Sequence, residues 1–451
     1  MLLAVRFEGL TWVGQVCRTW VRLALGWGCV MVTSVVQRGQ AGAPPRARWA
    51  IAVVVGSLLA GACTSGSEPG SSAESGTSSQ VGGSTSSQAH DRIRGSAGLM
   101  EPLLPTAGSS AEREVDDAVA VELEQLLGSP SFRTLRSILV LADGRQVLER
   151  YYQSEPTDHH HVWSITKSVI STLVGIAIGR GELQGVDQDL AEVLPAYAST
   201  MPPAVAGTTL EQILTMTGGF GRDDPGARVG PVTDWVAEIL AELSSSSESS
   251  SASGGAFRYS NAGVHVLSAI LVQATGMSTL DYARQVLFDP LGISSTPARE
   301  PVADGEDWQS FDAAFEAPGF AWAVDPQGVH TGGWGLRLRA QDLARIGLMY
   351  LSDGRWQGQQ VVPEEWIREA TRAHVEARGE RQTGEYGYLW WVTTADGAPA
   401  FAAIGSGGQI LEVVPSRGLV VVLQSESDGR GGPTARMLHI VDSLIAPSFR
   451  S

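Results

Sequence analysis

Lysine is almost absent from this chain of 451 residues. Of its 32 basic residues only Lys167 is a lysine, and the others are arginine. Arginine stays protonated in proteins, whereas a lysine loses its proton when it is buried, so a basic side chain that must act as a general base has one candidate. Ser164 stands three residues before it, a spacing at which helical side chains share a face. A biased base composition of the gene would also replace lysine by arginine throughout the chain. The assignment of Ser164 as nucleophile and Lys167 as base therefore needs support from other motifs.

Cysteine is also scarce, and none follows Cys63, which excludes a disulfide from the rest of the chain. Residues 46–63, RARWAIAVVVGSLLAGAC, place two arginines before a short apolar run that ends in small residues and Cys63. This ending fits the bacterial lipobox, which predicts cleavage before Cys63 and a lipid on its sulfur. A single transmembrane anchor is the alternative, although the run is short for a span. Both interpretations place the rest of the chain outside the cytoplasm.

The composition divides the chain into three parts: a lipoprotein signal peptide (1–63), a disordered Ser/Gly-rich tether (64–112) and a folded domain (113–451). The stretch before Arg46 is long for a signal peptide, so we expect that the start is assigned too early and that Met31 or a nearby codon begins a more ordinary signal peptide. Cleavage removes six arginines and one glutamate, which leaves 26 basic and 47 acidic residues and a net charge of −21. Such a surface repels nucleic acid and anionic lipid headgroups, so we expect no nucleic-acid partner and a membrane link through Cys63 alone.

Three consecutive histidines, His159 to His161, lie just before Ser164. In an extended segment two of them point one way and one the other, and zinc needs at least one more ligand than such a pair provides. The remaining histidines are scattered without ligand spacing. We therefore expect no metal and no cofactor, and interpret the run as a packed or solvated approach to the following helix.

Strand patterns lie at both ends of the folded domain. Residues 135–152 alternate around Asp143-Gly144 as in a hairpin, and three short strands follow one another between 398 and 426 before a final amphipathic helix. The middle is mostly helical, with candidates at 164–179, 209–217, 233–243, 262–275, 279–288 and 340–352. The economical fold is α/β (α+β): one antiparallel sheet built from both ends, flanked by helices, with a mostly helical region inserted.

Three motifs with candidate catalytic residues lie far apart in the sequence: Ser164-Ile165-Thr166-Lys167, Tyr259-Ser260-Asn261 and Gly405-Ser406-Gly407-Gly408-Gln409. Their order and spacing resemble the serine β-lactamase and penicillin-binding superfamily, specifically its class C-type branch with peptidases, esterases and 6-aminohexanoate-dimer hydrolases. The resemblance extends over nearly all of residues 130 to 446. It implies the β-lactamase/transpeptidase-like fold and a serine hydrolase that works through an acyl-enzyme.

The resemblance also implies roles for the motif residues. Ser164 would be the nucleophile, Lys167 its proton acceptor and Tyr259 the acid/base for the leaving group, while Asn261 would bind Lys167 and the substrate. The backbone N–H groups of Ser164 and Gln409 would form the oxyanion hole, next to Ser406, Gly407 and Gly408. Acyl transfer needs these same parts on chemical grounds: an activated hydroxyl, an adjacent base and two donors for the oxyanion.

Ser406 departs from the pattern, because lactamases and peptidases of this superfamily usually carry Lys or His there to hold a substrate carboxylate. An ester or amide is therefore the favoured substrate, and a β-lactamase, a D-Ala-D-Ala carboxypeptidase or a non-catalytic cell-wall binding lipoprotein are the alternatives. Trp334 and the cluster Tyr388, Trp390 and Trp391 would either line the substrate cleft or pack in the core.

Overall fold

The computed structural model falls into two units, Met1–Ile93 and Arg94–Ser451. The structure describes residues 17–21, 30–34, 117–127, 129, 132–223, 232–245, 255–305, 307–377, 384–426 and 433–449. In the first unit, strands β1 (Cys17–Val21) and β2 (Val30–Ser34) form an antiparallel pair. The predicted lipidation site, Cys63, lies outside the described residues, and so does the stretch taken as the tether.

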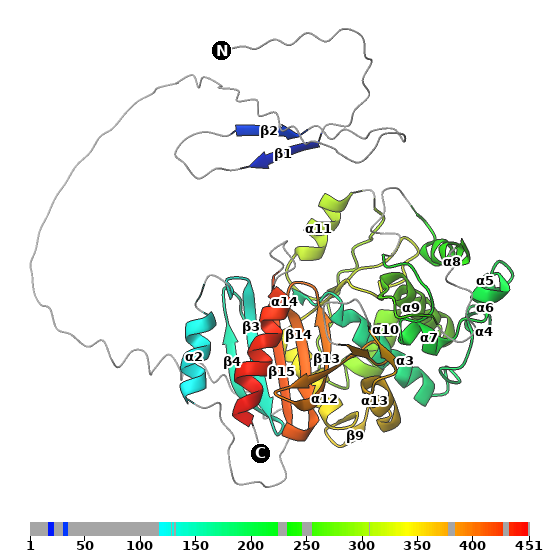
Figure 1. Cartoon of the computed structure of the whole chain (residues 1–451). Coiled ribbons are helices and arrows are strands. Elements are labelled where there is room, and N and C mark those ends of the chain that lie inside the picture. The colour runs from blue at the N-terminus through cyan, green and yellow to red at the C-terminus, as the bar shows by residue number, and fades with distance from the viewer. Residues whose placement is uncertain are drawn as a thin grey trace, which may run out of the picture. The chain divides into compact units, whose positions relative to one another are not determined.

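An antiparallel sheet of eight strands forms the centre of the second unit (Figure 1), in the order β10-β11-β12-β13-β14-β15-β3-β4. Its strands are β3 (Leu135–Ala142), β4 (Arg145–Tyr151), β10 (Val375–Glu376), β11 (Glu385–Tyr386), β12 (Trp391–Ala395), β13 (Ala398–Gly405), β14 (Gln409–Val414) and β15 (Leu419–Ser425). Strand β15, from the C-terminal part, pairs with β3, from the N-terminal part. The predicted sheet built from both ends is therefore confirmed.

The turn between β3 and β4 shows how the sequence specifies this hairpin. Asp143 and Gly144 have φ of 50° and 77°. A two-residue hairpin with positive φ at both central positions matches the twist of the strands, and Asp-Gly is among the sequences that adopt it most readily. The alternating pattern on either side of Asp143-Gly144 had indicated this turn correctly.

The region between β4 and β12 is mostly helical, as predicted. Its helices are α3 (Ile165–Gly179), α4 (Leu190–Val193), α5 (Pro195–Ala198), α6 (Pro203–Ala206), α7 (Leu210–Leu214), α8 (Trp235–Ser245), α9 (Asn261–Thr275), α10 (Thr279–Ala283), the π-helix η3 (Arg284–Phe288), α11 (Trp308–Glu316), α12 (Ala340–Leu351) and α13 (Glu364–Thr371). Short strands accompany them: β5 (His160–His161), β6 (Ala321–Trp322) and β7 (Leu336–Leu338) form one sheet, and β8 (Arg355–Trp356) pairs with β9 (Gln359–Gln360).

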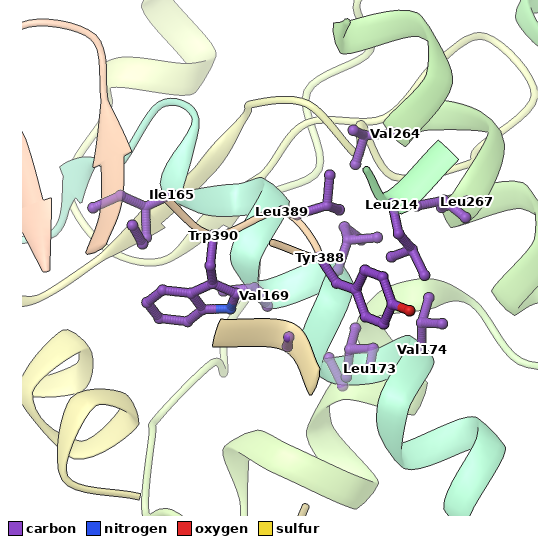
Figure 2. Close-up of a cluster of buried hydrophobic side chains, with 14 of the residues drawn as sticks. Ile165, Val169, Leu173, Val174, Leu214, Val264, Leu267, Tyr388, Leu389 and Trp390 are labelled. Carbon is purple, nitrogen blue, oxygen red and sulfur yellow. The ribbon is translucent and has the colours of Figure 1, made fainter. Parts of the chain in front are cut away.

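Helix α3 is the buried centre of the helical region. All of its residues from Ile165 to Ala177 are buried, and the helix contacts α9 and strands β13 and β14. Figure 2 shows Val169, Leu173 and Val174 of this helix among side chains from α7, α9 and the segment before β12. An apolar surface around the whole circumference predicts such a buried helix, and the structure confirms it. The site at its first turn is therefore held rigidly from several sides.

A layer of helices covers the other face of the sheet. It consists of α2 (Asp117–Leu127), α14 (Pro433–Ile440), the π-helix η5 (Val441–Ile445) and the 3-10 helix η6 (Ala446–Phe449), and another 3-10 helix, η4 (Pro415–Arg417), links β14 to β15. Figure 1 shows α14 crossing β14 and β15, and its residues Met437 and Ile440 join the buried cluster on this face. In the described part of the chain no single helix is long and apolar enough to span a membrane; α9 together with Thr279–Phe288 passes that test only as a pair bent by 75°.

Candidate active site

The nucleophile candidate lies at the beginning of α3, where the backbone turns sharply. Trp163 has φ of 50°, a left-handed conformation that is rare for a bulky residue, and Ser164 follows as the N-cap of the helix. Strained residues of this kind cluster at functional sites. In the part of the chain that the structure describes, the N–H of Ser164 has no hydrogen-bond partner, so it is available to a ligand.

Three oxygen atoms surround the amine of Lys167, whose side chain is 1% exposed. Its Nζ lies 3.0 Å from Ser164 Oγ, 2.7 Å from Asn261 Oδ1 and 2.6 Å from the carbonyl oxygen of Gly333. The last two oxygens can only accept hydrogen bonds. A neutral amine at this position would donate its two N–H groups to these acceptors and direct its lone pair at Ser164 Oγ. The arrangement suits a base that takes the hydroxyl proton.

Helix α9 brings Tyr259 and Asn261 to this amine. Ser260 caps the helix by accepting the N–H of Gly263, and its hydroxyl donates to the carbonyl of Gly221 at 2.6 Å. The ring centroid of Tyr259 lies 4.8 Å from Lys167 Nζ. The Tyr-Ser-Asn spacing thus places an aromatic ring and an amide on either side of one buried helix cap.

Strands β13 and β14 bring the third motif to the same place. A Cβ at Gly405 would lie 2.3 Å from the carbonyl oxygen of Val162 and 3.1 Å from Cβ of Trp163, so only glycine lets the strand come this close to the nucleophile. Ser406 is exposed, and Gly407 and Gly408 turn the chain with φ of 79° and 91°. The side chain of Gln409 is buried and its amide donates to the carbonyl of Ser425, which fixes the start of β14.

The predicted residues thus meet at the first turn of α3, but sequence reasoning missed one partner. The carbonyl of Gly333 belongs to the segment Thr331–Gly335, which was noted only for Trp334. This segment passes directly over α9: a Cβ at Gly332 would lie 2.1 Å from the carbonyl oxygen of Val264, and one at Gly333 would lie 2.9 Å from Cα of Asn261. Two adjacent glycines before a tryptophan were the available signal for this close backbone approach.

The three histidines form part of the small sheet beside the nucleophile. His160 and His161 make up β5 and pair with Leu338 and Arg337 of β7. Burial, followed by the nearby Arg337 guanidinium, lowers the pKa of His161 to about 3. Within the described ranges no group of three or more His, Cys, Asp or Glu side chains could hold a metal ion. Through its pairing with β7, the run leads the chain into the strained turn at Trp163.

The aromatic residues named from the sequence have different surroundings. Trp390 is fully buried and its indole N–H donates to the hydroxyl of Tyr350, so it packs in the core (Figure 2). Tyr388 is 4% exposed and donates to Glu211. Trp391 is stacked on Tyr259 at a centroid distance of 6.0 Å, so it packs against the ring of a candidate site residue.

Comparison with known proteins identifies the family of the chain. The family model described as Beta-lactamase matches residues 135–443, about two thirds of the chain. The chain belongs to the beta-lactamase family. It is 28% identical over 384 residues to a 6-aminohexanoate-dimer hydrolase from Paenarthrobacter ureafaciens, covering 76% of this chain and 87% of the relative.

Solved structures of the beta-lactamase family share the fold. A penicillin-binding protein homologue from Caulobacter crescentus superposes with a TM-score of 0.57 at 17% identity, over 74% of this chain and 98% of that one. A class C beta-lactamase from Rhodobacter sphaeroides gives 0.52 at 18% identity, over 74% and 99%. The family consists of serine hydrolases, and the resemblance inferred from the three motifs is confirmed.

Proposed function

We propose that this beta-lactamase-family protein cleaves an ester or amide through a covalent acyl-enzyme on Ser164. The observation that carries the proposal is the position of the Lys167 amine, with two acceptor oxygens on its N–H groups and Ser164 Oγ 3.0 Å away. The same three contacts also allow an ammonium ion. Two further parts of an acyl-transfer site are present. The Ser164 N–H has no partner among the described residues, and the ring centroid of Tyr259 lies 4.8 Å from Lys167 Nζ.

The proposed acylation moves one proton along the site. Lys167 Nζ accepts the hydroxyl proton as Ser164 Oγ forms a bond to the substrate carbonyl carbon, and the carbonyl oxygen becomes an oxyanion. The N–H groups of Ser164 and Gln409 stabilise this charge. Tyr259 then passes the proton from Lys167 to the leaving alcohol or amine as the carbon–heteroatom bond breaks. Water releases the acyl group by the reverse proton path.

The substrate class follows from what stands at position 406. Ser406 is exposed and uncharged, so it offers a hydroxyl where a cation would hold a carboxylate. The relative from Paenarthrobacter ureafaciens carries the name of an amide hydrolase, 6-aminohexanoate-dimer hydrolase. Both observations favour a linear amide or ester over a β-lactam or a D-Ala-D-Ala peptide.

A rate panel on the full chain tests this proposal. A p-nitrophenyl ester, a linear amide and the β-lactam nitrocefin are compared, and intact-mass analysis looks for an acyl adduct that disappears in Ser164→Ala. We expect ester or amide turnover with the adduct on Ser164 and little turnover of nitrocefin. Fast nitrocefin hydrolysis would instead support a β-lactamase, and no adduct with any substrate would favour a non-catalytic binding protein.

We further propose that the protein is an extracytoplasmic lipoprotein, tethered to the membrane by a lipid on Cys63. The support is the sequence alone: an apolar run after Arg46 and Arg48 that ends in Leu-Ala-Gly-Ala-Cys. Radiolabelled palmitate should enter the protein expressed in a bacterial host and be absent from Cys63→Ala. Labelling that survives the substitution would contradict the anchor.

A further inference from the structure

The carbonyl of Gly333 is a backbone group, so something else must fix where it lies relative to Lys167. We propose that two histidines, His161 and His265, are positioning residues that hold the Gly333 carbonyl against the amine from opposite sides. This inference rests on the proposed function for its effect on rate. Each histidine acts through the segment Asp325–Gly335, here called the carbonyl loop.

His265 holds the beginning of the carbonyl loop to the helix that carries Asn261. It lies four residues after Asn261 on α9, one helical turn along the same face. Its Nε2–H donates to Asp325 Oδ2 at 3.1 Å, and both side chains are 0% exposed. The other carboxylate oxygen of Asp325 accepts the N–H groups of Gln327 and Val329 at 2.9 and 2.8 Å. Removing one partner of a buried polar pair leaves the other unsatisfied, so the link is strong.

His161 holds the end of the carbonyl loop to the segment that carries Ser164. Its Nε2 accepts the N–H of Gly335 at 3.2 Å. The lowered pKa of His161 keeps the ring neutral at physiological pH, as an acceptor nitrogen requires. The ring is also stacked on Trp163 at a centroid distance of 4.0 Å and meets Phe315 edge-on at 4.7 Å. One side chain therefore binds both the loop and the residue before the nucleophile.

The loop between these two anchors is stiff. The N–H of Thr331 donates to Ala323 at 2.8 Å, the N–H of Ala323 donates to Gly335 at 2.9 Å, and the Thr331 hydroxyl donates to the carbonyl of Trp334 at 2.5 Å. A displacement at either anchor is therefore transmitted to Gly333. If its carbonyl moves, one N–H of Lys167 loses its acceptor and the lone pair turns away from Ser164 Oγ. Errors of about 1 Å in such geometry cost up to about 10²-fold in rate.

The solitary lysine makes the position of this amine measurable without any substrate. In the full chain, with a purification tag that contains no lysine, ¹³Cε-labelled lysine gives one signal, from Lys167. We compare wild type with two loss variants, His161→Phe, which keeps a stacked ring without the acceptor, and His265→Leu. Two conservative variants keep the links: His161→Gln retains an acceptor for the Gly335 N–H. Asp325→Asn retains the acceptor for Gln327 and Val329 and offers a donor to His265 Nε2 in the other tautomer of the ring.

Two controls match the loss variants. Ser268→Ala, on the same helix as His265, breaks a buried hydrogen bond of 2.8 Å to Thr279 of α10. His374→Phe replaces a histidine that is stacked on Tyr388. We expect the Lys167 signal to move in both loss variants and to stay in place in both controls. Acylation by a p-nitrophenyl ester should fall by about 10- to 100-fold in the loss variants with substrate binding unchanged, and recover to within a few-fold of wild type in the conservative ones.

The outcomes separate this inference from the proposed function. Loss variants that match the controls in both signal and rate would overturn the positioning role. If wild type forms no acyl adduct at all, the proposed function fails, while a signal that moves only in the loss variants still supports the placement of the carbonyl. Thermal melts identify a variant that does not fold. Should His265→Leu be such a variant, His161→Phe decides the question, since His161 is only partly buried.

Discussion

A buried ionisable side chain lies on each side of the central sheet, Lys167 on one and Glu412 on the other, and the two have different surroundings. On the face that packs against α3, Lys167 is 1% exposed and three oxygen atoms surround its amine. On the face that packs against α14, Glu412 of β14 is 3% exposed and accepts one hydrogen bond, from the hydroxyl of Thr393 at 2.9 Å. Burial raises the pKa of Glu412 to about 7, in spite of that hydrogen bond, and Asp442 adds to the rise.

The two buried groups differ in the number of hydrogen-bonding partners that the fold brings to them. A buried charge is tolerated when hydrogen bonds replace the lost water, and otherwise the group favours its neutral form. The partners of Lys167 come from α3, α9 and the carbonyl loop, so three elements converge on one amine. Glu412 accepts from a single donor, Thr393 of β12, which lies two strands away in the sheet. Changes at Lys167 should therefore affect rate with little effect on stability, and changes at Glu412 should do the reverse.

The largest expected effect comes from Lys167→Arg. A guanidinium stays protonated and cannot accept the Ser164 proton, so the acylation rate should fall by at least about 10²-fold while the thermal midpoint stays close to wild type. Burst kinetics with a p-nitrophenyl ester and circular dichroism melts measure the two quantities. Lys167→Met is the matched variant, because it removes the amine without the larger guanidinium of Lys167→Arg. A Lys167→Arg protein that acylates at nearly the wild-type rate would exclude Lys167 as the base.

Tyr259→Phe should have the next largest effect. Only a hydroxyl is lost, and the ring can remain stacked on Trp391, so the fold should be retained while the acylation rate falls by about 10²-fold. Tyr386→Phe is the control, because its ring lies 6.5 Å from that of Tyr259 and no proposed step uses it. Equal losses in the two variants would show that the change in rate comes from packing and not from proton transfer.

The sequence predicted the parts of the site that have a side-chain signature. Ser164, Lys167, Tyr259 and Asn261 are recognisable by residue type and spacing, and the structure brings them together. Their assigned roles stay predictions. The Gly333 carbonyl could not be predicted in this way, because every residue has a carbonyl and only the close passage over α9 gives this one a purpose.

The fold shows the same division between local and long-range information. Elements with a strong period were found: the hairpin at Asp143-Gly144, helix α3 and the strands β13 to β15. The two-residue strand β5 was not, because two residues carry no pattern and the strand exists only through its pairing with β7. The roles of His161 and His265 depend on residues 174 and 60 positions away, respectively, which no local pattern contains.

The last prediction concerns Glu412 and stability. Its pKa rises from an ordinary 4.5 to about 7 in the folded protein. Between pH 4.5 and pH 7 the folded protein therefore keeps a proton on Glu412 that the unfolded chain has released. This group therefore contributes no loss of stability below about pH 4.5, and its burial costs progressively more as the pH rises toward 7. At 1.36 kcal/mol per pKa unit, the wild type should lose about 2 to 3 kcal/mol of unfolding free energy between pH 5 and pH 8 from this residue alone. Glu412→Gln cannot ionise, so its unfolding free energy should lack that slope, while its acylation rate should stay within about twofold of wild type because Glu412 faces away from the site. Urea unfolding at pH 5 and pH 8 measures the difference, with Glu385→Gln, at an exposed position of β11, as the control that should follow the wild type. Parallel pH profiles for wild type and Glu412→Gln would show that Glu412 is hydrated in the folded protein, and the contrast between the two faces of the sheet would then be lost.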